Sequence, residues 1–232
     1  MRRFYKAVTI GDDGTILLDG RTVKTPARNP LTSPSAALGE AMAEEWRAQG
    51  DTIDPRAMPL TGLANAAIDH VAPDPAAFAQ TLAAYAETDL LCYRADEPPE
   101  LVARQAKDWD PLLDWARTRY DIAFEIATGI VHVPQPETTV AQLAAALAAR
   151  DPFRLAALSP LITIGGSLVT ALALAEYHLD PDTAFATTHL DELWQEEKWG
   201  EDSFAAATRA AHRHDFEAAA RFLQLLDDGS LG

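Results

Sequence analysis

Carboxylates and tryptophans are concentrated in one stretch near the end of the sequence, from His189 to Asp202 (HLDELWQEEKWGED). Carboxylates at this density could bind a metal ion, transfer protons or pair with cations on a partner. A tryptophan beside them could anchor a partner, because its side chain buries a large area at low entropic cost. The residues in question are Asp191, Glu192, Glu196, Glu197, Glu201, Asp202, Trp194 and Trp199.

The spacing of these residues predicts an amphipathic helix. At 3.6 residues per turn, Leu190, Leu193 and Trp194 fall on one side. Glu192, Glu196 and Trp199 follow a neighbouring stripe, and Gly200 comes where a C-terminal cap is expected. The acidic stripe is either a solvated face or a surface that binds a partner, and the pattern alone leaves both open.

Metal binding is one alternative for the same stretch. His189, Glu192 and Glu196 have i, i+3, i+7 spacing and could share a helix face as ligands. A zinc site usually needs three or four ligands and a second shell of hydrogen bonds, whereas surface His and Glu are common on acidic helices. We therefore expect no metal and no cofactor, and we keep a metal-dependent enzyme as the alternative.

A second pair of carboxylates, Glu87 and Asp89, lies in a largely apolar context (YAETDLLCYR). Such a pair could serve a small hydrolase if burial shifted its pKa values. Arg94 is close in sequence, and a structural ion pair is the better interpretation. The sequence contains no GxGxxG, GxxxxGK[ST] or GxSxG motif, and no catalytic constellation is recognisable in it.

Charge and composition limit the possible partners and location. The net charge of −16 over 232 residues should repel nucleic acid and anionic membranes. Cys92 is the only cysteine, and no apolar leader is found, so we expect a cytoplasmic protein. The uncharged stretch 155–175 is long enough to span a bilayer, but it contains Pro160, Gly165 and Gly166. A buried helical segment split at Pro160 is expected, without membrane insertion.

The order of predicted elements indicates an α+β fold. Strands are expected up to residue 25, with Asp19-Gly20 as a hairpin turn. Helices then dominate, including 182–199 and 202–227 near the end. We predict a small β-rich N-terminal domain, 1–57, followed by a larger mostly α-helical domain, 58–232.

Several motifs in one order resemble a known family, the chaperones that assemble the F(1) sector of ATP synthase in mitochondria and alpha-proteobacteria. The stretches that carry the resemblance are DGRTVKTPARNPL (19–31), EEWRAQGDTIDP (44–55), MPLTGLANAAIDH (58–70), ETDLLCYRADEP (87–98), QAKDWDPLLDWA (105–116) and HLDELWQEEKWG (189–200).

The resemblance implies a two-domain protein without enzymatic activity that binds the unassembled alpha subunit. It implies that the protein shields a surface of that subunit which later contacts the beta subunit, and that it is a monomer when free. Carried over by resemblance, the partner-binding residues are Glu192, Gln195, Glu196 and Trp199. Trp46 is carried over as an important position whose role could equally be core packing.

Overall fold

The computed structural model of the chain describes residues 1–129 and 131–227. These residues form two compact units. The first comprises Met1–Pro75, Asp151–Ala157 and the residues from Ala218 onward; the second comprises Ala76–Arg150 and Leu158–Glu217. The predicted α+β class is confirmed, since small sheets accompany a large helical part. The domain boundary expected after residue 57 falls inside the first unit and stays a prediction.

The first unit begins with an antiparallel sheet of three strands, in the order β1 (Val8–Ile10), β2 (Ile16–Leu18) and β3 (Arg21–Thr22). Asp19 and Gly20 both have positive φ, +48° and +75°, which closes the turn between β2 and β3 as the Asp-Gly pair predicted. The Asp19 carboxylate also accepts the backbone N–H of Ala7 at 2.8 Å. This contact fixes the segment that leads into β1.

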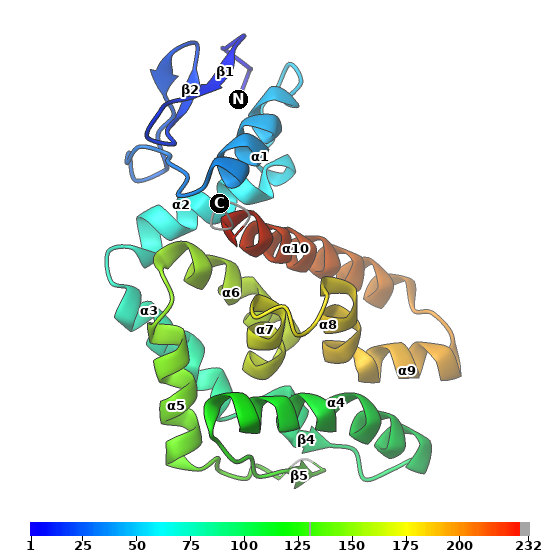
Figure 1. Cartoon of the computed structure of the whole chain (residues 1–232). Coiled ribbons are helices and arrows are strands. Elements are labelled where there is room, and N and C mark those ends of the chain that lie inside the picture. The colour runs from blue at the N-terminus through cyan, green and yellow to red at the C-terminus, as the bar shows by residue number, and fades with distance from the viewer. Residues whose placement is uncertain (130, 228–232) are drawn as a thin grey trace. The chain divides into compact units, whose positions relative to one another are not determined.

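Helix α1 (Ala36–Arg47) packs against this sheet (Figure 1). Glu45, in its last turn, accepts the backbone N–H groups of Leu60 and Thr61 at 2.7 and 2.8 Å. Those two groups belong to the first turn of α2 (Pro59–Ala66), where backbone donors lack intrahelical partners. Burial raises the pKa of Glu45, and the carboxylate ties α1 to α2. A 3₁₀ turn, η1 (Pro55–Ala57), precedes α2, and a π-helical turn, η2 (Ala67–Val71), follows it.

Segments far apart in the sequence complete the first unit. The Ser35 hydroxyl accepts the N–H of Leu38 at the start of α1, and it donates to the carbonyl of Leu225 at 2.6 Å. The rings of Phe153 and Phe222 stack with centroids 6.3 Å apart. Leu225 and Phe222 of α10 therefore contact the start of α1 and the start of α6 within this unit.

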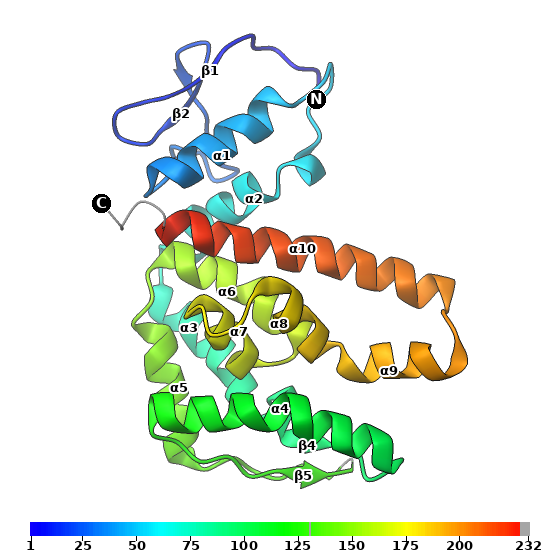
Figure 2. The same cartoon turned by 45° about the vertical axis from the view of Figure 1, so that its right-hand side comes forward.

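The second unit is mostly helical (Figures 1 and 2). A parallel pair of short strands, β4 with β5, accompanies its helices. Helices α6 and α10 are divided between the two units, and Pro75, the first residue of α3, belongs to the first unit. The elements are α3 (Pro75–Ala83), η3 (Ala84–Ala86), η4 (Leu90–Cys92), β4 (Tyr93–Arg94), α4 (Pro99–Tyr120), β5 (Ala127–Thr128), α5 (Glu137–Ala148), α6 (Pro152–Gly165), α7 (Leu168–Ala175), α8 (Pro181–Thr188), α9 (Leu190–Trp199) and α10 (Ser203–Asp227).

Helix α7 forms the centre of this unit and contacts both α4 and α8. The expected break at Pro160 is wrong: Pro160 lies inside α6, and the helix ends at Gly165. Gly166 has φ +64°, and Ser167 caps α7 by accepting the N–H of Thr170. A proline costs one hydrogen bond but does not always end a buried helix, whereas a left-handed glycine followed by a cap does.

Most of the uncharged stretch is buried within the protein, in agreement with the sequence interpretation, although Thr163 is exposed. Gly165 allows a close approach to α8, because a Cβ atom there would lie 2.9 Å from the Thr188 methyl carbon. Among the helices of the described residues, none combines the length and apolar character that crossing a membrane requires.

Candidate functional site

The acidic, tryptophan-rich stretch forms α9, a separate helix rather than the end of the expected helix 182–199. His189 leaves helical geometry (φ −108°, ψ 19°) and divides α8 from α9. After α9 the chain turns and enters α10 (Figure 2). Gly200 makes this turn with φ +89°, as expected of a glycine after a helix. The Asp202 carboxylate then accepts the N–H groups of Phe204 and Ala205, which caps α10.

One side of α9 holds the helix in place. Leu190 and Trp194 are buried, as the helical spacing predicted, whereas Leu193, on the same side, is half-buried. Asp191 accepts a hydrogen bond from the Gln105 amide at 2.8 Å, and Glu197 pairs with Arg104 at 2.7 Å. The latter pair holds the pKa of Glu197 below its usual range. Two of the acidic residues are thus occupied with attaching α9 to α4.

The other side of α9 and the start of α10 enclose a hollow of about 480 Å³, called here the α9–α10 groove. Two large apolar side chains line it while standing in solvent: Trp199 is 74% exposed and Phe204 is 82% exposed. The Trp199 ring rests edge-on against Trp194, with centroids 5.4 Å apart, so a buried residue supports it. The groove is lined by Glu192, Gln195, Glu196, Trp199, Gly200, Asp202, Phe204, Ala205, Thr208, Arg209 and His212.

The four α9 residues proposed from the sequence therefore share one groove, but they are not equivalent. Glu196 is half-buried and forms an ion pair with Arg209, whose side chain is only 15% exposed. Glu192 lies 4.0 Å from the same guanidinium and keeps 60% of its side chain in solvent. Gln195 is exposed. Trp46 belongs to the first unit, where it is half-buried.

Glu196→Gln and Glu192→Gln should differ in their effect on stability. Glu196→Gln weakens a pair in which Arg209 is mostly buried, and we expect a loss of about 1 kcal/mol in the free energy of unfolding. Glu192→Gln affects an exposed group and should change it by less than about 0.5 kcal/mol. Chemical denaturation of the two variants measures both values. Equal losses would contradict the unequal roles assigned to the two carboxylates.

Phe204 and Arg209 line the groove, but the sequence pattern did not predict a role for either residue. Phe204 follows Trp199 by five positions, across the Gly200 turn, in the first turn of the next helix. An aromatic residue in an otherwise polar and small-residue segment was the available signal. That signal alone does not say that both rings stay exposed.

The proposed metal ligands have other partners. His189 is buried, stacks on Phe185 with ring centroids 3.9 Å apart, and has its Nδ1 3.0 Å from the Phe185 carbonyl. Burial lowers the pKa of His189, which favours the neutral ring. Within the described residues, no group of three or more His, Cys, Asp or Glu side chains is arranged to hold a metal ion.

The other candidate carboxylates, Glu87 and Asp89, have structural partners. Asp89 is fully buried and accepts hydrogen bonds from Leu91 N, Ser167 Oγ and Val169 N at 2.9–3.0 Å. Glu87 accepts the backbone N–H of Gln135 at 3.3 Å. These contacts connect segments of the second unit.

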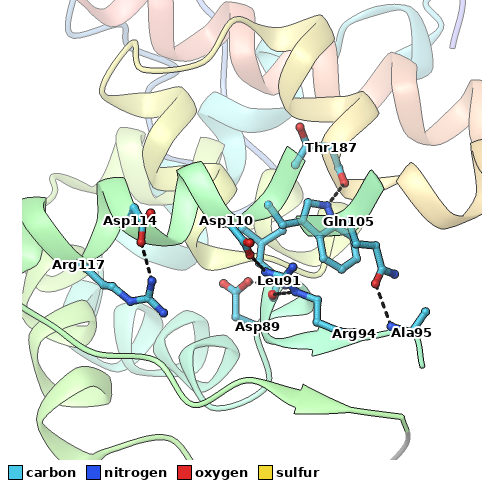
Figure 3. Close-up of polar contacts among 10 residues, drawn as sticks. Asp89, Leu91, Arg94, Ala95, Gln105, Asp110, Asp114, Arg117 and Thr187 are labelled. Atoms are coloured by element: carbon cyan, nitrogen blue, oxygen red, sulfur yellow. Dashed lines mark hydrogen bonds and ion pairs between the residues drawn. The ribbon is translucent and has the colours of Figure 1, made fainter. Parts of the chain in front are cut away.

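Arg94 does not pair with either carboxylate of the motif, contrary to the ion pair expected there. It bonds the Leu91 carbonyl at 2.9 Å and the Asp110 carboxylate at 2.7 Å, and Gln105 holds the neighbouring Ala95 N–H (Figure 3). The ETDLLCYR motif thus attaches the 89–95 segment to α4.

An exposed aromatic pair on a groove with a charged rim is typical of a surface that binds another protein. The chain belongs to the ATP12 chaperone family: the model described as "ATP12 chaperone protein" matches residues 2–117, half of the 232 residues.

Relatives of known structure agree with this assignment. The crystal structure of Atp12 from Paracoccus denitrificans is 43% identical, with a TM-score of 0.91 over 97% of this chain and 98% of that one. A structure from Agrobacterium tumefaciens is 42% identical, with a TM-score of 0.91 over 97% of this chain and 86% of that one. The mitochondrial protein atp12 of Schizosaccharomyces pombe is 25% identical over 86% of this chain and 74% of its own length.

Proposed function

We propose that this chaperone assists assembly of the ATP synthase F(1) sector by binding the unassembled alpha subunit. Family membership supports a role in ATP synthase assembly without catalysis. In this proposal it shields the surface of the alpha subunit that later contacts the beta subunit, and the beta subunit displaces it. The free chaperone is a monomer in the cytoplasm.

The observation that carries the proposal is the exposure of Trp199 and Phe204 along one groove. Leaving two large rings in water is unfavourable unless a partner covers them, and Trp is a frequent anchor in protein interfaces. A subunit that awaits its neighbours in a ring exposes apolar surface and tends to aggregate. The groove offers apolar contact to such a surface.

The charged residues around Trp199 and Phe204 favour binding of a specific partner over nonspecific apolar binding. Glu192 and Gln195 are exposed at the rim, while Glu196 is paired with Arg209. In the proposal, Glu192 pairs with a cation of the client, and Trp199 and Phe204 supply contact area. Rim charges mainly affect the association rate and the choice of partner, whereas buried rings determine how long the complex lasts.

The test is a doubly substituted chaperone, Trp199→Ala with Phe204→Ala. Light scattering would follow aggregation of purified alpha subunit with the wild-type or variant chaperone added. We expect the variant to lose protection, because truncating an interface anchor costs about 2–4 kcal/mol in binding. Its melting temperature should stay close to that of the wild type, since both rings are exposed.

Val131→Ala is a matched control, because Val131 is 69% exposed, belongs to the same unit and does not line the groove. It should protect as well as the wild type. A double variant that melts normally and protects fully would place the client elsewhere. Protection that disappears in high salt for the wild type would indicate a general acidic docking surface instead of an apolar interface.

A further inference from the structure

The first unit has two adjoining hollows, and neither shares a lining residue with the α9–α10 groove. The first hollow has a volume of about 580 Å³ and is lined by Phe4, Tyr5, Leu18, Asp19, Arg21 and Thr22. The second has a volume of about 440 Å³, and its lining includes Pro26, Leu31, Ile53, Met58, Thr61 and Asn65. Met1, Val23, Lys24 and Trp46 line both. The pair is called here the Trp46 groove.

Three residues that line the second hollow have a buried side-chain atom without a hydrogen-bond partner within the described residues. These atoms are the indole nitrogen Nε1 of Trp46, the hydroxyl oxygen Oγ1 of Thr61 and the side-chain oxygen Oδ1 of Asn65. An unpaired buried donor or acceptor costs about 1–3 kcal/mol, so a folded protein rarely retains one without a reason. Here an N–H donor, an oxygen acceptor and a hydroxyl, which can act as either, line the same hollow. A peptide group of a bound chain offers the complementary C=O and N–H.

The charge of the surrounding segment is opposite to that of the whole protein. Met1 to Arg28 holds six basic residues against three acidic ones, in a chain of net charge −16. Asp19 accepts backbone N–H groups of Lys6 and Ala7, so its charge is partly engaged. Neither Arg21 nor Lys24, which line the groove, forms an ion pair with any described residue. Free cations beside an apolar hollow favour an acidic ligand.

The geometry also favours an extended ligand. Strand β3 (Arg21–Thr22) is at the edge of the sheet, and its residues line the first hollow. An extended peptide can lie beside an edge strand, where its side chains alternate between pockets and solvent. A helical ligand would have its peptide groups bonded internally and could not offer them to Trp46 and Asn65.

We propose that the Trp46 groove is a second client-docking site, which binds an extended segment with an apolar centre and flanking acidic residues. This inference rests on the proposed function, because it takes the segment to belong to the same client. The client's apolar side chains fill the two hollows, its peptide groups bond Trp46 Nε1 and Asn65 Oδ1, and its carboxylates pair with Lys24 and Arg21.

The probe is a capped pentapeptide, Glu-Leu-Val-Leu-Glu, compared with its lysine-flanked counterpart, Lys-Leu-Val-Leu-Lys. Both are titrated into the isotope-labelled full chain and followed by NMR. We expect the acidic peptide to shift the indole N–H signal of Trp46 and the amide signals of Val23 and Lys24, with a dissociation constant of about 1 mM or below. The lysine peptide should bind at least about tenfold more weakly.

Three variants separate the contacts. Trp46→Phe keeps a ring but removes the donor, and Asn65→Leu keeps the size but removes the acceptor. Each should weaken the acidic peptide at least about tenfold. Lys24→Glu, at an exposed position, should reduce the preference for the acidic peptide. Trp115→Phe, in the other unit and outside both grooves, should leave peptide binding unchanged.

The outcomes distinguish this inference from the proposed function. If the wild type protects the alpha subunit but neither peptide shifts the Trp46 groove signals, the second docking site is wrong and the proposed function stands. Equal binding of both peptides would also overturn it. If the wild type gives no protection, the proposed function fails, and the peptide titration still decides whether the groove binds extended acidic segments.

Discussion

Trp109→Ala should lower the free energy of unfolding by about 3–5 kcal/mol. Trp109, in α4, is 1% exposed, its indole N–H donates to the Thr187 carbonyl at 3.0 Å, and the Arg94 guanidinium lies 5.3 Å from its ring. The alanine variant leaves a cavity nearly as large as the indole ring. It also removes the only side-chain donor that bonds the Thr187 carbonyl among the described contacts. Chemical denaturation followed by far-UV circular dichroism measures the loss.

Trp115→Ala is the matched control for this prediction. It is the same change in the same helix, at a half-buried ring that stacks on His178 with centroids 5.0 Å apart. It should cost less than half as much, because less buried area is lost. Trp109→Phe should fall between the two, since it keeps most of the volume but not the hydrogen bond. Equal losses for Trp109→Ala and Trp115→Ala would refute the central role given to Trp109.

Asp89 should make the second unit more stable at mildly acidic pH than at neutral pH. Complete burial raises the pKa of this carboxyl from 3.8 to about 6. A raised pKa in the folded state means that the folded protein holds the proton more tightly than the unfolded chain. The stabilisation is therefore fully present below the unfolded pKa and is lost as the pH rises through about 6. The shift corresponds to about 2–3 kcal/mol between pH 4 and pH 7.

The measurement is the difference in unfolding free energy between the wild type and Asp89→Asn across this range. The variant cannot ionise, and it loses the acceptor for Val169 N, so it should be less stable than the wild type throughout. Its deficit should shrink by about 2–3 kcal/mol from pH 4 to pH 7. A deficit that does not change with pH would show that Asp89 keeps an ordinary pKa in the folded state.

Asp180 also accepts a backbone N–H at the start of a helix, but its pKa shifts in the opposite direction from that of Asp89. It caps α8 by accepting Thr183 N, as Asp89 accepts Val169 N at α7, but it is exposed and these hydrogen bonds lower its pKa. A lowered pKa contributes stability above the unfolded value, and this is lost as the pH falls. The deficit of Asp180→Asn should therefore grow with rising pH, opposite in sign to that of Asp89→Asn.

Local signals in the sequence predicted the elements that depend on local chemistry. The Asp19-Gly20 turn, the last helix, expected at 202–227, and the burial of Leu190 and Trp194 on one side of α9 are as expected. The helix boundaries that were wrong depend on tertiary contacts. Pro160 stays helical inside a buried α6, and His189 interrupts a run of helix-forming residues while stacked on Phe185. Neither packing partner is visible in the pattern.

The lining of the α9–α10 groove was predictable in part, for the same reason. Helical periodicity put Glu192, Glu196 and Trp199 on one stripe, and they line one groove. Periodicity could not tell that Arg209, 13 residues after Glu196, returns to neutralise it. Exposure of Phe204 depends on the direction of the turn at Gly200, which sequence spacing does not give. Trp46, expected on a buried face or at a binding surface, is half-buried beside two hollows.

The hydrogen bond from Ser35 to the Leu225 carbonyl has a consequence for synthesis on the ribosome. It joins groups 190 residues apart, within a unit that also needs Asp151–Ala157. The N-terminal sheet and α1 are translated long before the segments that complete their unit. At about 5–20 residues per second, the nascent first unit waits some tens of seconds before it can close. During that interval this member of a chaperone family exposes unfinished surface of its own.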